Sequence, residues 1–170
     1  MISEEKKKMK AKRVAFISIS VALAMVLSFL ESLIPPLAAV PGIKPGLANS
    51  VTLFLLYRLG APVAILVSLV RVFLSSLLFG SVVSLWYSLA GACLSFAVML
   101  LLKKTDKFST VGVSVAGAVM HNAAQITVAA LLMETAEIIS YLPVLTVTGV
   151  ITGIIVGVIA GLVSARIKKI

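Results

Sequence analysis

The sequence predicts an all-α integral membrane protein, a bundle of six transmembrane helices with both termini in the cytoplasm. Of its 170 residues, 61% are hydrophobic and 12% are charged, whereas soluble domains contain roughly 45–50% apolar residues. Apolar runs near the length of a membrane helix, about 20 residues, recur along the chain, and basic residues gather between them. A soluble chain of this length could not bury so much apolar surface in one core.

The apolar runs follow one another closely, so we expect a single membrane domain over residues 1–170. It comprises a basic N-terminal segment (1–13), a six-helix bundle (14–165) and a basic tail (166–170). The second span is short, about 20 Å of helix at 1.5 Å per residue. It must therefore be tilted, lie near one surface, or leave depth for the loop before it. The expected spans are Val14–Ile34, Leu47–Leu59, Ala61–Phe79, Val82–Leu102, Thr110–Met133 and Leu142–Ala165.

The basic residues predict the orientation, because cytoplasmic loops carry an excess of lysine and arginine. With the N-terminus inside, 13 of the 15 Lys and Arg residues lie on the cytoplasmic side. Of the other two basic residues, Lys44 is then outside and Arg71 lies within the membrane. The acidic residues Glu134 and Glu137 also lie outside. Five spans would place one basic terminus outside, so we expect six, in the plasma membrane. Because topology explains the net charge of +9, we expect no nucleic-acid partner.

A rigid cationic loop, Pro41–Gly46, precedes the second span and contains Lys44. Proline fixes the backbone angle φ, and glycine permits turns that are closed to other residues. A helix N-terminus beside a lysine is a ready anion site. Asn49 and Thr52, three residues apart, share a face of the first turn of this helix. The alternative is an ordered outer loop with an interfacial lysine.

Arg71 lies in the middle of the third span. A guanidinium at mid-membrane costs at least about 2.5–3.5 kcal/mol on insertion scales, so it must face the bundle interior or a water-filled cavity. We expect it to be the counter-charge of an anionic ligand. The alternative is a structural pair with Glu31 or with backbone carbonyls.

Polar residues also interrupt the fifth span, where His121 and Gln125 are four residues apart and share a helix face with Asn122 beside them. An unsatisfied polar group in lipid is costly, so these side chains are expected to avoid it. Either at least one of them contacts a ligand, or they form hydrogen bonds between helices. Trp86 and Tyr87, early in the fourth span, are expected in an aromatic belt or stacked on a ligand ring.

Small residues form a face on two of the spans. Glycines recur every four residues from Gly149 to Gly161, which gives three overlapping GxxxG units. This face can pack against another span, or Gly153 and Gly157 can dock a separate subunit. The first span has a similar stripe, which can pack internally or meet a partner: Ser18 and Ala22, with Ser20 and Ala24 one ridge over.

Several chemistries are missing from the sequence. It contains no P-loop and no GxSxG motif, and Asp106 is its only aspartate. A trans-prenyltransferase needs two aspartate-rich motifs to bind magnesium diphosphate. The chain has one cysteine, Cys93, and one histidine, so it offers neither an internal disulfide nor a Cys/His metal cluster. We therefore expect no enzyme activity, no catalytic residues, no metal and no cofactor.

Three segments resemble a known membrane family: Pro41–Asn49, Arg71–Ser81 and Gly112–Asn122. This is the family named both "heptaprenyl diphosphate synthase component I" and "Gx transporter", and the resemblance covers nearly the whole chain from Ala15 on. Its layout is similar to that of the substrate-binding S components of energy-coupling-factor (ECF) transporters. The resemblance implies an outward-opening ligand pocket, capped by the loop after the first span. It also implies a stripe on the first span that docks a transmembrane coupling subunit, driven by two cytoplasmic ATPases.

We therefore expect a membrane-embedded substrate-binding subunit for a small, anionic and partly apolar molecule. A flavin, a quinone precursor and an isoprenoid phosphate fit this description. The alternative, implied by the synthase name, is a non-catalytic membrane component associated with a prenyl (heptaprenyl) diphosphate synthase. The residues expected to contact the ligand are Lys44, Asn49, Thr52, Arg71, His121, Asn122 and Gln125.

Overall fold

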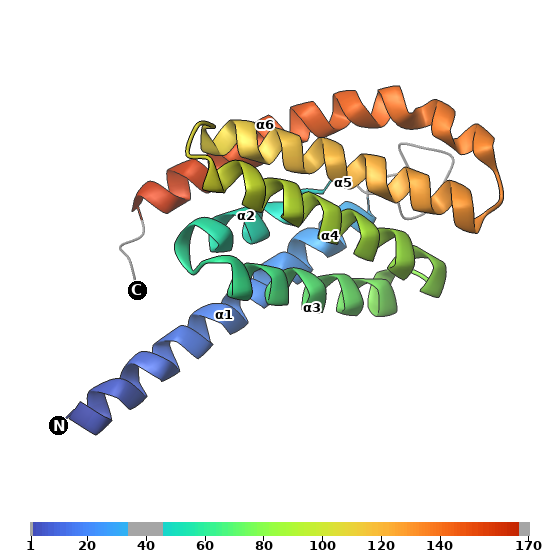
Figure 1. Cartoon of the computed structure of the whole chain (residues 1–170). Helices are drawn as coiled ribbons and strands as arrows, with labels where there is room; N and C mark the ends of the chain where they lie inside the picture. Colours follow the sequence, from blue (N-terminus) through green and yellow to red (C-terminus); the bar gives the residue numbers. More distant parts are fainter. Residues whose placement is uncertain (1, 34–45, 167–170) are drawn as a thin grey trace.

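The protein is all-helical in the part of the chain that the computed structural model describes, residues 2–33 and 46–166 (Figure 1). Six α-helices and one short 3-10 helix follow one another. Their bounds are α1 (Ile2–Ser32), α2 (Asn49–Arg58), α3 (Ala61–Phe79), α4 (Val82–Lys104), α5 (Thr110–Leu132), η1 (Ala136–Tyr141) and α6 (Leu142–Arg166).

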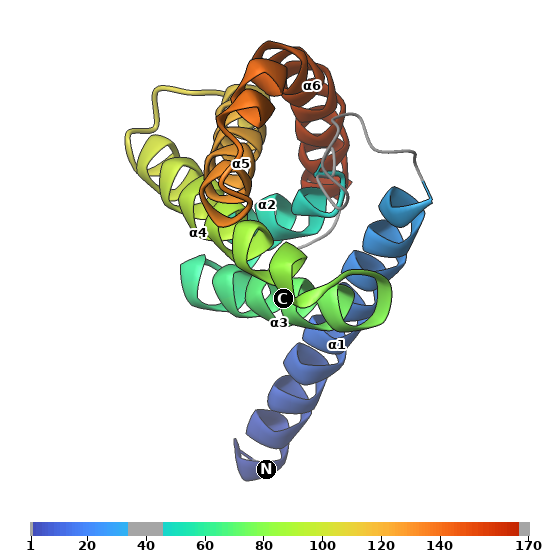
Figure 2. The same ribbon diagram turned by 90° about the vertical axis from the view of Figure 1, so that its right-hand side faces the viewer.

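The long helices surround the short helix α2. Helix α6 packs on α5, α5 on α4, α4 on α3, and α3 on α1, while α2 contacts all five of them. Figure 2 shows α2 between the α5–α6 pair and α3. The start of α1 and the end of α6 lie toward the same end of the bundle, as do the α2–α3 and α4–α5 turns (Figure 1). Which side of a membrane this end faces stays a prediction.

Five of the helical segments are long and apolar enough to cross a membrane, which indicates a multi-pass membrane protein. They are Lys7–Ser32, Ala61–Phe79, Val82–Lys104, Thr110–Leu132 and Ala136–Arg166. Five of the six predicted spans thus have a full-length counterpart, and the predicted second span does not.

The second helix is shorter than the predicted span Leu47–Leu59. Helix α2 has 10 residues, about 15 Å at 1.5 Å per residue. It ends before Gly60, whose φ of +88° favours glycine, and α3 follows with Pro62 in its first turn. Gly46 and Ala48, just before α2, are non-helical and buried. Irregular backbone is tolerated at membrane depth where protein covers it. Whether α2 is tilted, lies near one surface or leaves depth for the segment before it stays a prediction.

Helix α1 begins at Ile2 rather than at Val14, because the glutamates, lysines and other good helix formers of the basic segment extend it. Its first half projects away from the bundle (Figure 1). The two small-residue ridges of α1 have different environments. Ser20 and Ala24 are buried within the chain, whereas Ser18 and Ala22 are exposed. Only the Ser18 ridge is therefore open to a partner.

The glycine ridge of α6 faces α5 at Gly149, Gly153 and Gly157. A Cβ atom at Gly153 would lie 2.6 Å from the Val115 Cα atom, and one at Gly157 would lie 2.7 Å from the Val111 Cα atom. Glycine thus lets the two backbones touch. Of the two alternatives for this ridge, the structure therefore favours packing against another helix of the same chain. Helix α5 occupies the positions at which Gly153 and Gly157 were expected to dock a separate subunit. Gly161 has no described atom within 4 Å of its Cβ position.

Candidate ligand-binding site

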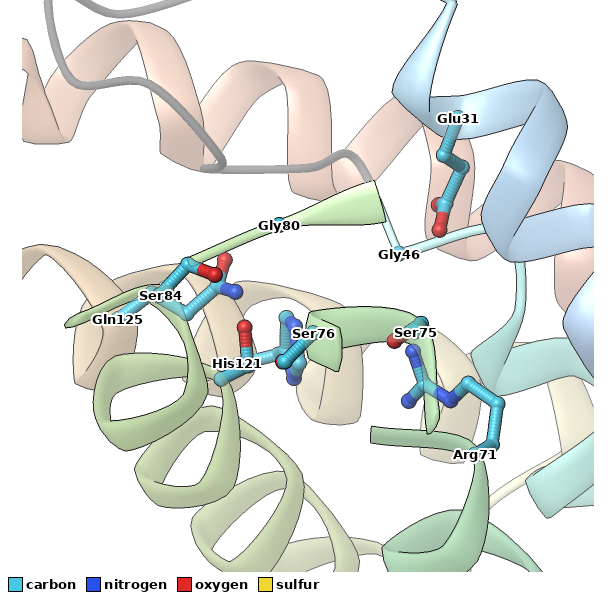
Figure 3. Close-up of a pocket in the computed structure, with 10 residues that line it drawn as sticks. Glu31, Gly46, Arg71, Ser75, Ser76, Gly80, Ser84, His121 and Gln125 are labelled. Carbon is cyan, nitrogen blue, oxygen red and sulfur yellow. The ribbon is translucent and has the colours of Figure 1, made fainter. Parts of the chain in front are cut away.

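A small polar cavity lies where the end of α1 and the segment before α2 meet α3, α4 and α5 (Figure 3). Its volume is about 20 Å³, enough for a single water molecule. The described residues around it include no large apolar side chain. They are Glu31, Gly46, Arg71, Ser75, Ser76, Gly80, Ser84, Ser88, His121 and Gln125.

Arg71 supplies the positive charge of this polar cavity. Its side chain is 5% exposed, and its Nη2 atom donates a hydrogen bond of 3.0 Å to the Asn49 Oδ1 atom on α2. The Arg71 Nε and Asn49 Nδ2 atoms are buried without a hydrogen-bond partner in the described part of the chain. The structure therefore brings two of the predicted site residues together and leaves part of their hydrogen-bonding capacity unused.

Glu31, near the end of α1, supplies a negative charge to the same cavity and is 2% exposed. Its carboxylate accepts a hydrogen bond from the Leu47 N–H group, which joins α1 to the segment before α2. Glu31 also lies within electrostatic range of Arg71. The hydrogen bond that the structure gives to the Arg71 side chain nevertheless goes to Asn49.

The start of α2 differs from the open helix N-terminus that the sequence predicts. The N–H groups of residues 49–51 donate to the carbonyls three residues before them, so the first turn satisfies its own donors. The Leu47 N–H group is engaged by Glu31. Helix α2 therefore contributes to the site through the Asn49 side chain rather than through free backbone N–H groups.

His121 and Gln125 line the cavity from α5, as their four-residue spacing predicts. They are 3% and 2% exposed. The His121 Nδ1 and Gln125 Oε1 atoms have no hydrogen-bond partner among the described residues. Gly91 on α4 makes room for both side chains. A Cβ atom there would lie 2.8 Å from the Gln125 Cγ atom and 3.0 Å from the His121 ring.

Three predicted site residues are not among the described residues that line the cavity: Asn49, Thr52 and Asn122. Asn122 points to α6, where its Nδ2 atom donates to the Leu145 carbonyl at 2.8 Å. Thr52 is buried on α2 but is not part of the described lining. Lys44 lies outside the described residues.

Four serines of the lining were missed by the sequence reasoning. Ser75 follows Arg71 by four residues on α3, so the two share a helix face, and Ser76 is next to it. Ser84 and Ser88 are four residues apart on α4. This spacing was a usable signal, because it extends the polar face that Arg71 begins. Ser84 also exchanges hydrogen bonds with Ser81 at the start of α4.

Of the two predicted roles of Trp86 and Tyr87, ligand stacking is not supported by the lining. Trp86 is 59% exposed on the outside of α4, as a residue of an aromatic belt would be. Tyr87 is buried in an apolar cluster with Ile126 and Leu145. Neither residue is among the described residues that line the polar cavity.

Among the described residues, the cavity is lined by one buried cation, one buried carboxylate and several neutral donors and acceptors, which are the groups that bind a small polar molecule. A family model described as heptaprenyl diphosphate synthase component I matches residues 7–163, a range that contains every lining residue. No curated protein and no solved structure is significantly similar to the chain. The chain belongs to the heptaprenyl diphosphate synthase component I family.

Proposed function

We propose that this membrane protein is the substrate-binding subunit of a transporter, similar in role to an ECF S component, and that it binds a charged small molecule at Arg71. The observation that carries the proposal is the incomplete hydrogen bonding around this buried arginine. Arg71, His121 and Gln125 converge from α3 and α5 on one cavity, and each has a buried polar atom without a partner in the described chain.

Such a cluster is costly unless a ligand completes it. Leaving a buried donor or acceptor unsatisfied costs about 1–3 kcal/mol, and more for charged groups. A mid-membrane guanidinium adds a cost of its own. A ligand with an anionic group and further polar atoms would recover these costs on binding. The unsatisfied groups therefore favour a ligand site over a purely structural polar cluster.

The ligand-bound form must be more open than this structure. Pockets for small organic ligands usually have volumes of about 300–1,000 Å³, whereas this cavity has about 20 Å³. The hydrogen bond between Glu31 and the Leu47 N–H group joins two walls of the cavity. We propose that the end of α1 and the segment before α2 separate to admit the ligand.

The exposed ridge of α1 at Ser18 and Ala22 suits the docking of a transmembrane coupling subunit with two ATPases. Small residues let a partner helix approach closely in a membrane. This ridge is on the same helix as Glu31, so a partner that docks on α1 could also move the end of α1 that borders the cavity.

The alternative function is that of a non-catalytic membrane component of a heptaprenyl diphosphate synthase, which the description of the family favours. The two functions differ in the proteins that bind the chain. Purification from native membranes should yield a coupling subunit and ATPases under the proposed function. Recovery of a soluble, aspartate-rich synthase instead would support the alternative.

Arg71→Gln tests the proposed function, because it removes the charge and keeps polarity and much of the length. We expect the binding free energy of the ligand to weaken by about 1.5–3 kcal/mol, the range for hydrogen bonds to charged groups. Mass spectrometry should detect this as a loss of the co-purified ligand. Arg71→Lys should restore only part of the lost binding, since lysine lacks the planar guanidinium group of arginine.

Arg58→Gln is the matched control, because Arg58 ends α2 and is not among the described cavity residues. Thermal unfolding in detergent should show that all three variants are folded. A folded Arg71→Gln protein that retains its ligand as the parent does would show that Arg71 is a structural cation.

A further inference from the structure

We infer that the ligand is a small carboxylate with a short apolar chain, and that this chain lies in a second hollow beside the polar cavity. The inference rests on the proposed function and specifies its substrate class. This α3–α4 hollow lies at the turn between the two helices and has a volume of about 160 Å³, whereas the polar cavity has about 20 Å³. The described residues that line it are Ser76, Leu77, Gly80, Ser81, Val82 and Leu85.

The α3–α4 hollow and the polar cavity adjoin at Ser76 and Gly80, which line both of them. Gly80 follows the last residue of α3. A Cβ atom there would lie 2.5 Å from the Ser84 Oγ atom and 3.1 Å from the Ser76 carbonyl oxygen. Glycine is therefore the residue that fits at this junction, and it adds no side chain between the two spaces. A single molecule can reach from one space to the other at this point.

The two spaces differ in chemistry, which gives the ligand a direction. Charged and polar side chains line the polar cavity, whereas two leucines and a valine line the α3–α4 hollow. The Arg71 guanidinium group points toward Ser75 and Ser76 (Figure 3), and its Nε atom has no hydrogen-bond partner in the described chain. An oxyanion bound to Arg71 therefore directs the rest of the ligand past Ser76, toward the apolar side chains.

The cavity favours a head group with a single negative charge. Glu31 also lines it and interacts electrostatically with Arg71. Each negative charge that the ligand adds is repelled by Glu31, and this repulsion is larger in a buried site than in water. A carboxylate adds one charge, whereas a phosphate monoester adds about 1.5 to 2. Glu31 itself accepts a hydrogen bond from the Leu47 N–H group, and no ligand contact with Glu31 is required.

The volume of the α3–α4 hollow limits the length of the apolar chain. An apolar cavity of about 150 Å³ is large enough for benzene, so a hollow of about 160 Å³ suits an apolar group of about six carbon atoms. A flavin ring system or a long isoprenoid chain is too large for it. The partly apolar ligand that the sequence predicts is thereby narrowed to short-chain carboxylates.

The test measures the affinity of the purified full-length protein, in lipid nanodiscs, for the straight-chain carboxylates from acetate to decanoate. Calorimetry should show that affinity rises about fourfold per methylene group that leaves water. The rise should stop near hexanoate or heptanoate, because longer chains exceed the hollow. Hexanol keeps the chain and lacks the charge, so it should bind about tenfold more weakly than hexanoate or worse.

Two substitutions that fill the hollow should act on the chain and not on the head group. Leu85→Trp should weaken hexanoate binding about tenfold and leave acetate binding unchanged. Val82→Trp should have the same effect, and it provides the test if Leu85→Trp does not fold, because Val82 is 71% exposed. Leu94→Trp is the control and should bind hexanoate as the parent does. Leu94 is exposed on the same helix and is not among the described residues of either space.

The inference is overturned if affinity does not rise with chain length, or if no carboxylate binds. It is also overturned if hexanol binds as tightly as hexanoate, which would mean that the hollow holds a lipid chain. A third contradiction would be a Leu94→Trp protein that loses hexanoate as the Leu85→Trp protein does. In each of these cases the proposed function still stands where the protein retains a co-purified molecule that depends on Arg71. If no such molecule is retained and no carboxylate binds, both proposals fail together.

Discussion

Helix α5 meets its two neighbours in different ways. Toward α6 it makes backbone contact with the glycine ridge, and the Asn122 Nδ2 atom donates a hydrogen bond to the Leu145 carbonyl, while the Asn122 Oδ1 atom has no hydrogen-bond partner among the described residues. Toward α4 it faces Gly91 with His121 and Gln125, each of which has a buried polar atom without a partner in the described chain. The face toward α6 is closed by backbone contact, whereas the face toward α4 borders the polar cavity and is incomplete.

The contrast shows that residue type alone does not reveal a role. Glycine brings two backbones together at Gly153, whereas at Gly91 it makes room for side chains. His121 and Asn122 are adjacent in sequence, but about 3.6 residues make one helical turn, so they point roughly 100° apart. The useful distinction is whether a polar side chain bonds a neighbouring helix, as Asn122 does, or lines the cavity, as His121 does.

The largest effect is expected from closing the α5–α6 contact with Gly153→Leu. The new side chain would have to occupy the space of the Val115 backbone, which is 2.6 Å from the Cβ position. Backbone cannot move aside as a side chain can, so we expect the free energy of unfolding to fall by about 3 kcal/mol, the upper end of the usual range for overpacking. Thermal unfolding in detergent measures this change.

Gly161→Leu is the matched control, because no described atom lies within 4 Å of its Cβ position. It adds the same side chain to the same helix and should leave the melting temperature close to that of the parent. If both variants unfold at the same temperature as the parent, the inferred tight contact between the backbones of α5 and α6 is contradicted.

An intermediate effect is expected from Gly91→Ala on the incomplete face. The methyl group would displace Gln125 and the His121 ring, which lie within 3.0 Å of it. We expect ligand retention to fall about tenfold, since each 1.4 kcal/mol of lost binding free energy is a factor of ten. Stability should change little, because alanine favours the helix by about 1 kcal/mol over glycine and so offsets the strain.

Gly112→Ala is the control for this substitution. It is also on a long helix, but its Cβ position is 3.6 Å from the nearest described neighbour, the Ser109 Oγ atom, which is an ordinary contact. Mass spectrometry of co-purified ligand should separate the two variants. Equal retention by both would show that the position of His121 and Gln125 does not matter for binding.

The sequence predicted the long helices well because an apolar run of membrane length has few other uses. The predicted third span has the same bounds as α3, Ala61–Phe79. The first helix began earlier than predicted because a search for apolar runs stops at charged residues that still favour helix. The second span was predicted to be longer than α2 because its first two residues, Leu47 and Ala48, are apolar but lie in a turn rather than in the helix.

The site was predicted in part. Arg71, His121 and Gln125 were found because charged and amide groups are rare and costly in membrane spans. The lining serines were missed, since serine can bond to its own helix backbone and therefore carries a weaker signal. Whether Asn122 faces a ligand or another helix depends on α6, which is far away in sequence. Glu31 was considered only as a structural partner of Arg71, because its place in the cavity depends on how α1 packs.

The smallest effect is expected from Asn122→Ala, which tests the closed face directly. Asn122 donates a 2.8 Å hydrogen bond to the Leu145 carbonyl, and such interhelical bonds in membranes contribute about 0.6 kcal/mol on average and up to about 1.7. The substitution should therefore lower stability slightly and leave ligand retention unchanged. His121→Ala, one residue earlier, should do the reverse, because it removes a cavity side chain whose Nδ1 atom has no partner in the described chain. Melting temperature and ligand retention, measured on both variants, form a two-way comparison. If Asn122→Ala loses the ligand and His121→Ala does not, the assignment of the two faces of α5 is reversed, because the residue that bonds α6 would then be the ligand contact.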